Sequence, residues 1–141
     1  MASDIHLTTE ERFGRTCVST GSKWEPLLGY SRAVRSGSHI AVTGTVGINA
    51  DGTYSPDVGE QCRRSLDIIL ASLHALGSDV RHVIRTRIYT TRLEEWQKIA
   101  AVHGEVFGEI RPATTLVGVA KLIDAEAVIE IEADAIVPDL E

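Results

Sequence analysis

Cysteine is scarce in this sequence of 141 residues, and the two that occur are not spaced as a redox pair or a metal site. Cys17 and Cys62 are far apart and form no CxxC arrangement, so we expect two free thiols and a cytoplasmic location. No apolar run reaches the roughly 18 residues of a membrane span. The N-terminal hexapeptide also lacks the basic and apolar parts of a signal peptide, so no membrane partner is expected.

Motifs that reveal a chemistry by themselves are missing as well. HExxH, GxGxxG, GxxxxGK and GxSxG do not occur, and the five histidines are not spaced as metal ligands. We therefore expect no metal and no cofactor. His103 lies on the apolar stripe of a predicted helix, and we interpret it as a partly buried, hydrogen-bonded side chain rather than a catalytic base.

Positive charge is in the minority. The 14 lysines and arginines face 20 aspartates and glutamates, and the resulting net charge of −6 argues against a nucleic-acid partner held through its phosphates. The composition, 43% hydrophobic and 24% charged, is that of an ordinary soluble domain with a core large enough to fold without disulfides. We expect a single domain over residues 1–141.

Two segments have the periodicity of amphipathic helices. Apolar residues at three- and four-residue steps predict one helix over residues 58–76, capped by Asp57 and ended by Gly77. A second helix is predicted over residues 93–107, with a Thr91–Glu94 capping box before it and Gly108 after it. The remaining face of the first helix, which includes Gln61, is expected to be solvated.

Strand-like segments surround these helices. They are predicted at residues 16–19, 31–34, 39–46 and 82–91, followed by two more in the last third of the chain. Gly44 interrupts the third of these strands, which usually marks a bulge or the close approach of another group. The expected order is β-β-β-α-β-α-β-β, an α+β domain with two helices on one face of a mixed sheet.

The final strand has an unusual polar face. Ile129, Ile131 and Ala133 alternate with Glu130, Glu132 and Asp134, which is typical of a half-buried strand. A solvated edge and a face that meets cations are both compatible with three carboxylates in a row. Arg85, Arg87 and Tyr89 share one face of an earlier strand and are the obvious partners.

The last third of the chain also resembles a known family. Arg111-Pro-Ala-Thr-Thr-Leu-Val-Gly-Val-Ala-Lys-Leu122, followed by Val128-Ile-Glu-Ile-Glu-Ala133, is similar to the C-terminal signature of the RidA/YjgF family of imine and enamine deaminases. Leu28-Gly-Tyr-Ser31, His39–Gly44 and the helix around Gln61–Leu66 match that family in order and spacing. The resemblance implies a chorismate-mutase-like fold and a homotrimer that binds small metabolites in clefts between subunits.

The resemblance also implies a set of site residues. Active members continue the signature as Pro-Ala-Arg-Ser, and the arginine grips the carboxylate of a 2-imino or enamine acid; here Thr114 stands at that position. Glu130 matches the residue that positions the hydrolytic water. The other family positions that fall in the cleft are Tyr30, Thr43, Gly44 and Leu116, and Trp24 is either a core residue or a wall of the pocket.

Two questions stay open at this stage. Arg87 either replaces the missing arginine as an anion-binding residue or neutralises the carboxylates of the final strand, with Arg85 and Arg111 as weaker substitutes. The protein is either a hydrolase acting on a C–N bond of a small, anionic metabolite or a non-catalytic, ligand-binding trimer. Because threonine offers one neutral hydroxyl instead of a charged fork, standard 2-iminoacid deaminase activity is in doubt.

Overall fold

The computed structural model describes residues 4–139, and seven strands in this range form one mixed sheet. Their order across the sheet is β1-β2-β3-β4-β7-β5-β6, and all neighbours are antiparallel except β5 and β6. The strands are β1 (Thr8–Arg12), β2 (Arg15–Ser19), β3 (Ala33–Ser36), β4 (His39–Val46), β5 (Val83–Thr90), β6 (Ala113–Gly118) and β7 (Ile129–Ile136). No helix in residues 4–139 is long and apolar enough to cross a membrane. The N-terminal segment considered for a signal peptide includes residues 1–3, which lie outside the described residues.

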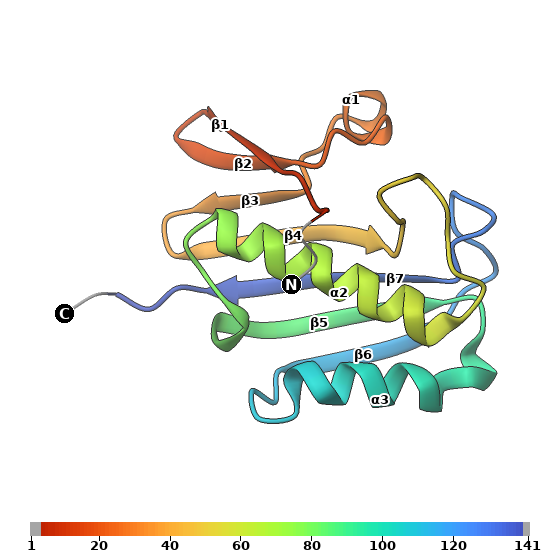
Figure 1. The fold of residues 1–141 in the computed structure, drawn as a ribbon. Coiled ribbons are helices and arrows are strands. Elements are labelled where there is room, and N and C mark those ends of the chain that lie inside the picture. Colours follow the sequence, from red (N-terminus) through yellow and green to blue (C-terminus); the bar gives the residue numbers. More distant parts are fainter. Residues whose placement is uncertain (1–3, 140–141) are drawn as a thin grey trace.

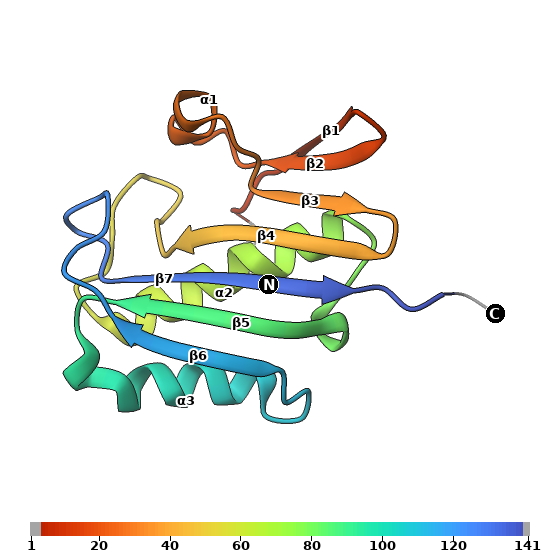
Figure 2. The ribbon, with the colours of Figure 1, turned by 180° about the vertical axis from the view of Figure 1, so that it is seen from behind.

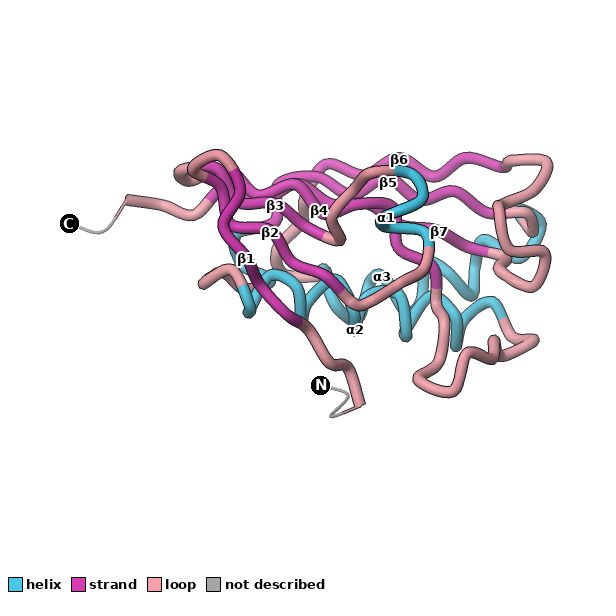
Figure 3. Tube along the Cα trace, turned by 90° about the horizontal axis from the view of Figure 1, so that it is seen from above, coloured by secondary structure: helices cyan, strands magenta, loops and turns pink. Residues whose placement is uncertain are grey.

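Two helices, α2 (Val58–Ala75) and α3 (Trp96–Phe107), cover one face of this sheet (Figures 1 and 3). Helix α2 connects β4 to β5, which run parallel because both are antiparallel to β7, and α3 connects β5 to its parallel neighbour β6. Crossovers of this kind are almost always right-handed, and both advance in the same direction across the sheet. Both helices therefore lie on the same side, which confirms the predicted fold class, and Figure 2 shows the opposite face without a helical layer.

The core lies between the sheet and α2. The helix buries the predicted stripe, and the strands contribute Val18, Ile40, Val42, Ile129 and Ile131. Asp57 caps the helix as predicted, since its carboxylate accepts the N–H of Glu60 at 2.9 Å. Gly77 follows the helix with a positive φ of 76°, which glycine adopts at little cost.

Gln61 corrects the prediction for the polar face of α2. This side chain is only 1% exposed, and its amide hydrogen-bonds to the carbonyls of Ser55 and Glu126 and to the N–H of Val128. A glutamine at a helix surface position looks solvated in the sequence. Here its long side chain reaches backbone groups of two loops that only the tertiary structure brings together.

The N-terminal region and the start of α3 also differ from expectation. Strand β1 and the short helix α1 (Trp24–Leu28) occupy segments without a clear pattern, and two 3₁₀ turns, η1 (Val80–His82) and η2 (Leu93–Glu95), precede β5 and α3. The predicted Thr91–Glu94 capping box is wrong, because η2 intervenes and neither it nor α3 has a side-chain cap. Gly108 ends α3 as predicted.

Strand β7, with its carboxylate face, occupies the centre of the sheet between β4 and β5. The solvated-edge interpretation is therefore wrong, while the alternation is confirmed: Ile129, Ile131, Ala133 and Ala135 are buried against the helices. The arginines of β5 face the carboxylates as expected, and Arg87 Nη1 lies 3.1 Å from Glu132 Oε1 and 3.4 Å from Asp134 Oδ2.

The interpretation of His103 is confirmed. Its Nε2 lies 2.9 Å from Thr86 Oγ1, its ring contacts that of Phe107 at 4.6 Å between centroids, and burial lowers the pKa of the imidazole. Cys17 and Cys62 are both buried free thiols, also as expected, and burial raises the pKa of Cys62 to about 12. None of these groups is exposed as a nucleophile or base.

Candidate functional site

A pocket of about 790 Å³ lies at the end of the sheet where β4 finishes and β7 begins. Its walls come from the connection between β2 and α1, from α1 itself, from the loop after β4 and from the loop before β7. The two loops lie next to each other at this end of the sheet in both ribbon views, with α1 above them (Figures 1 and 2). The pocket thus combines segments that are far apart in the sequence.

Four of the residues expected at a site line this pocket: Trp24, Tyr30, Gly44 and Glu130. Trp24 is partly buried at the first position of α1, and the ammonium of Lys23 lies 4.9 Å from its ring centroid. Thr43 lies beside the pocket rather than in its lining. Its N–H donates to Arg32 O at 2.9 Å and its hydroxyl donates to Ser31 O at 2.6 Å, so it holds the adjoining backbone in place.

Gly44 and Glu130 are in close contact at a β-bulge. The register between β4 and β7 shifts between Val42 and Thr45, as the glycine in the predicted strand suggested. A Cβ atom at position 44 would lie 2.7 Å from Glu130 Oε2. Glycine is therefore required for the Glu130 carboxylate to lie over the β4 backbone in its present position.

The Glu130 carboxylate is half-buried, and no hydrogen bond or ion pair joins it to another of the residues that the structure describes. Burial raises the pKa of this carboxyl, the charge of Arg32 lowers it and the charge of Glu132 raises it, with a net upward shift. An unpaired carboxylate with an elevated pKa, in a pocket, is suited to accept a proton from a bound water or substrate.

The raised pKa predicts that Glu130→Gln stabilises the fold at neutral pH. Below the ordinary glutamate pKa both the folded and unfolded states are protonated, and Glu130 has no electrostatic effect. As pH rises toward the elevated folded-state pKa, the unfolded state loses its proton first, so wild-type stability falls. We expect the glutamine variant to have the higher melting temperature at pH 7 and a difference that disappears near pH 4, measured by thermal unfolding across this range. A variant less stable than wild type at pH 7 would contradict this assignment.

Arg32 is the main pocket residue that the sequence-based prediction missed. Only 7% of it is exposed, and it lies just before β3, with its backbone N–H bonded to Val18 O of β2 and its carbonyl accepting from Thr43 of β4. Its guanidinium donates to Gly44 O at 2.8 Å, to Thr45 Oγ1 at 3.3 Å and to Tyr30 Oη at 3.2 Å. An arginine two positions after Tyr30 in a strand-like segment was the available signal, because alternate residues share a face.

Tyr54 and Asp124 form a hydrogen-bonded pair in the pocket wall. The Tyr54 hydroxyl, on the loop after β4, donates to Asp124 Oδ2 at 2.7 Å across to the loop before β7. Burial and this hydrogen bond raise the pKa of Tyr54, so its hydroxyl remains a donor at neutral pH. The pair joins the two loops directly at the pocket.

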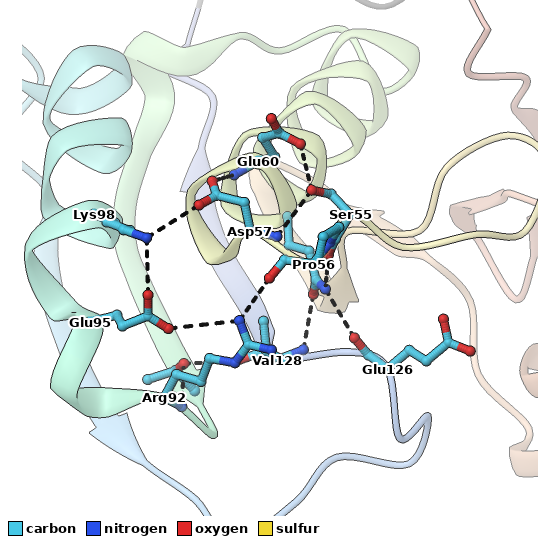
Figure 4. Close-up of polar contacts among 11 residues, drawn as sticks. Ser55, Pro56, Asp57, Glu60, Arg92, Glu95, Lys98, Glu126 and Val128 are labelled. Carbon is cyan, nitrogen blue, oxygen red and sulfur yellow. Dashed lines mark hydrogen bonds and ion pairs between the residues drawn. The ribbon is translucent and has the colours of Figure 1, made fainter.

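The same loops are anchored behind the pocket by a polar network around the N-terminus of α2 (Figure 4). Arg92 donates to Pro56 O at 2.7 Å, and Lys98 lies 3.0 Å from Glu95 Oε1 and 3.4 Å from Asp57 Oδ1. The bonds of Gln61 add to this network on the inner side. The pocket walls are therefore attached to α2 and α3 rather than free in solvent.

Thr114, Leu116 and Arg87 do not line the pocket. Thr114 pairs with Thr86 and Leu116 with Ile88, which places both on the helix-facing side of β6. The Thr114 hydroxyl is 2.8 Å from that of Thr86. The ion pairs of Arg87 favour the alternative in which it neutralises the carboxylates of β7.

No group of three or more His, Cys, Asp or Glu side chains in residues 4–139 is arranged to hold a metal ion. The groups that the pocket offers for chemistry include the half-buried carboxylate of Glu130, the buried cation of Arg32 and the hydroxyl group of Tyr30. This set resembles an acid–base site for a small polar molecule.

Comparison with known proteins agrees with the resemblance in the sequence. Residues 20–137 match the family described as Endoribonuclease L-PSP. The crystal structure of Rv2704 from Mycobacterium tuberculosis, described as a member of the YjgF/YER057c/UK114 family, has a TM-score of 0.81 and 43% identity, covering 87% of this chain and 99% of that one.

Two similar proteins come from Escherichia coli. The 2-iminobutanoate/2-iminopropanoate deaminase of strain K12 is 32% identical over 111 residues, 76% of this chain and 86% of its own length. The structure of TdcF with bound serine has a TM-score of 0.71 and 30% identity, and the match covers 76% of this chain and 87% of that one. Together with the match over residues 20–137, these similarities show that the chain belongs to the RidA/YjgF family.

Proposed function

We propose that this protein binds a small metabolite in the pocket beside Gly44 and hydrolyses an imine or enamine bond in it, with Glu130 as the general base. The observation that carries the proposal is the Glu130 carboxylate, which lines the pocket without an ion-pair partner and has a raised pKa. The deaminase activity in the name of the Escherichia coli relative supports the reaction class.

The proposed reaction needs only water as a co-substrate. Glu130 accepts a proton from a water molecule as the water oxygen attacks the carbon of the protonated imine, and this forms a neutral carbinolamine. The carboxyl then returns the proton to the nitrogen. The ionised Glu130 takes up the hydroxyl proton as the C–N bond breaks and the C=O bond forms, and it passes this proton to the departing ammonia. A pKa above that of an ordinary glutamate makes Glu130 suited to both directions of this proton transfer.

Ammonia release from freshly generated 2-iminobutanoate tests the proposal. We expect wild-type protein to accelerate the release and Glu130→Gln to reduce the rate about 10²- to 10⁴-fold, the usual contribution of a general base. Because hydrolysis requires the ionised carboxylate, the rate should also fall as pH drops through the Glu130 pKa. Full activity of the glutamine variant would exclude this role, and no acceleration by wild type on any imine would exclude the enzyme class.

Thr114 favours a second candidate, a ligand-binding trimer without turnover. Its neutral hydroxyl is engaged with Thr86, and the position where the resemblance expects an arginine offers no charge to a substrate carboxylate. A ligand that stabilises the protein in a thermal-shift assay, without ammonia release from any imine, would support this candidate. Since Thr114 and Leu116 do not line the pocket of their own chain, either candidate would receive them from a neighbouring subunit of the proposed homotrimer.

A further inference from the structure

We infer that Arg32 is the anion-binding residue of this pocket, the role that the missing arginine would have had, and that it selects ligands carrying a carboxylate next to the reacting carbon. This inference rests on the proposed function, in that it assigns a ligand class to the same pocket. Arg32 lies outside the family signature, and its role is inferred from its burial and its contacts.

The charge of Arg32 has no direct counter-ion. In residues 4–139, no carboxylate oxygen lies within 4.0 Å of the guanidinium nitrogens, the limit for an ion pair. Only 7% of the residue is exposed. Its three hydrogen bonds go to neutral oxygens, those of Gly44, Thr45 and Tyr30. A buried charge usually has an ionic partner because its removal from water is costly, so an anion that enters the pocket would complete the site.

Some N–H groups of the guanidinium are also not used by these hydrogen bonds. The three bonds come from Nη1 and Nη2 and use at most three of the five N–H groups, and Nε–H has no acceptor among the described residues. Nε–H shares one edge of the planar guanidinium with an N–H of Nη2. Two parallel N–H bonds from one edge are the arrangement in which arginine binds a carboxylate.

Other cations near the pocket are less suitable. Arg64 is engaged with Asp4 Oδ1 at 2.7 Å and with Ile48 O at 2.8 Å. Lys23 is exposed and lies over the Trp24 ring. Arg87 is paired with Glu132 and Asp134 and is absent from the lining. Arg32 is therefore the pocket-lining cation that is both buried and free of a carboxylate.

Arg32 and Glu130 lie beside the same residue, Gly44, which favours a small ligand. Both residues are next to Gly44: Arg32 Nη1 binds its carbonyl oxygen, and Glu130 Oε2 lies 2.7 Å from where a Cβ atom of residue 44 would be. One residue thus separates the cation from the proposed base. A small ligand whose anionic group is close to the carbon that water attacks, such as a 2-imino acid, is suited to meet both residues.

Tyr30 positions this arginine. Its hydroxyl accepts from Nη2 at 3.2 Å, and the guanidinium carbon lies 5.4 Å from its ring centroid. The backbone bonds of Arg32 to β2 and β4 fix the start of the side chain. The anion site is therefore preorganised, which lowers the entropic cost of ordering the Arg32 side chain when a ligand binds.

The test compares two probes that differ in one charge, 2-oxobutanoate and its uncharged amide, titrated at pH 7 and followed by NMR. Wild-type protein should prefer the carboxylate tenfold to a hundredfold, the value of a charge-assisted hydrogen bond. Arg32→Gln should abolish the preference. The control Arg81→Gln removes the same charge from an exposed pair with Asp79 and should leave the preference intact.

Binding is measured without turnover, so failure of this inference is distinguishable from failure of the proposed reaction. Glu130→Gln should lose ammonia release yet bind 2-oxobutanoate at least as tightly as wild type, because a like charge is removed from the pocket. An Arg32→Gln protein that folds and still prefers the carboxylate overturns the inference. If that variant does not fold, Arg32→Lys is measured instead, because lysine keeps the charge and loses the paired N–H donors of the guanidinium. An undiminished preference for the carboxylate overturns the inference. A preference reduced threefold or more supports it.

Discussion

Replacement of Gln61 by methionine should lower the free energy of unfolding by about 3 kcal/mol or more, since each buried amide or carbonyl left unpaired costs about 1–3 kcal/mol. Methionine has a similar length and a good helix propensity, so α2 itself is not weakened. The loss comes from the carbonyls of Ser55 and Glu126 and the N–H of Val128, which Gln61 binds at 2.7–2.9 Å. Urea unfolding followed by circular dichroism measures the change.

The matched control is Gln97→Met on the exposed surface of α3. It makes the same chemical change without breaking a buried hydrogen bond, and its effect should stay within about 0.5 kcal/mol. Equal stabilities for the two variants would show that the bonds of Gln61 do not anchor the pocket loops. Because those loops carry Tyr54 and Asp124, we also expect Gln61→Met to weaken ligand binding before the protein unfolds.

Gly47→Ala should have an effect of similar size for a steric reason. Gly47 is buried at the end of β4, directly against α2, and a Cβ atom there would lie 2.2 Å from Gln61 O and 2.7 Å from Gln61 Cα. Backbone atoms cannot turn aside as a flexible side chain does, so α2 and β4 must separate. Overpacking usually costs about 1–3 kcal/mol and more where the backbone must move, and we expect about 3 kcal/mol in urea unfolding.

Gly104→Ala is the matched control for Gly47→Ala, and here the same substitution should raise the stability instead of lowering it. Gly104 is exposed in the interior of α3, and a Cβ atom there would meet nothing within 4 Å. Alanine is the better helix former by roughly 0.5–1 kcal/mol, so this variant should be more stable than wild type. If Gly47→Ala were as stable as wild type, the close contact of β4 with α2 would be refuted.

The parts of the fold that were predictable depend on local periodicity. Strand β7 and helix α2 each bury one continuous stripe, so the spacing of Ile129, Ile131 and Ala133, or of Cys62, Leu66 and Ile69, already identifies the element and its inner face. The β1 strand has no such stripe, because all five of its residues are exposed. The capping box before α3 failed because a 3₁₀ turn separates Thr91 from the helix.

The candidate site was predictable in part, and through family resemblance rather than pattern. Tyr30, Gly44 and Glu130 belong to segments that match the RidA/YjgF family, and they line one pocket. Arg32 was missed because an arginine at the start of a strand normally points into water, and its burial arises from neighbours on β2 and β4. The resemblance expected Leu116 in the cleft and Thr114 at the arginine position, and only the pairing of β6 with β5 shows that both face the helices of their own chain.

The sequence by itself determined the apolar faces of the central strand β7 and of helix α2, the start of α2 at its Asp57 cap, and the ends of both long helices at a glycine. These are local properties, set by spacing, capping and residue identity. Only the tertiary structure decided that β7 lies in the centre of the sheet, that Arg87 is paired with carboxylates, and that Arg32 and Glu130 flank the same glycine. Such relations depend on strand order and register, which result from the packing of the whole chain and leave no local signature.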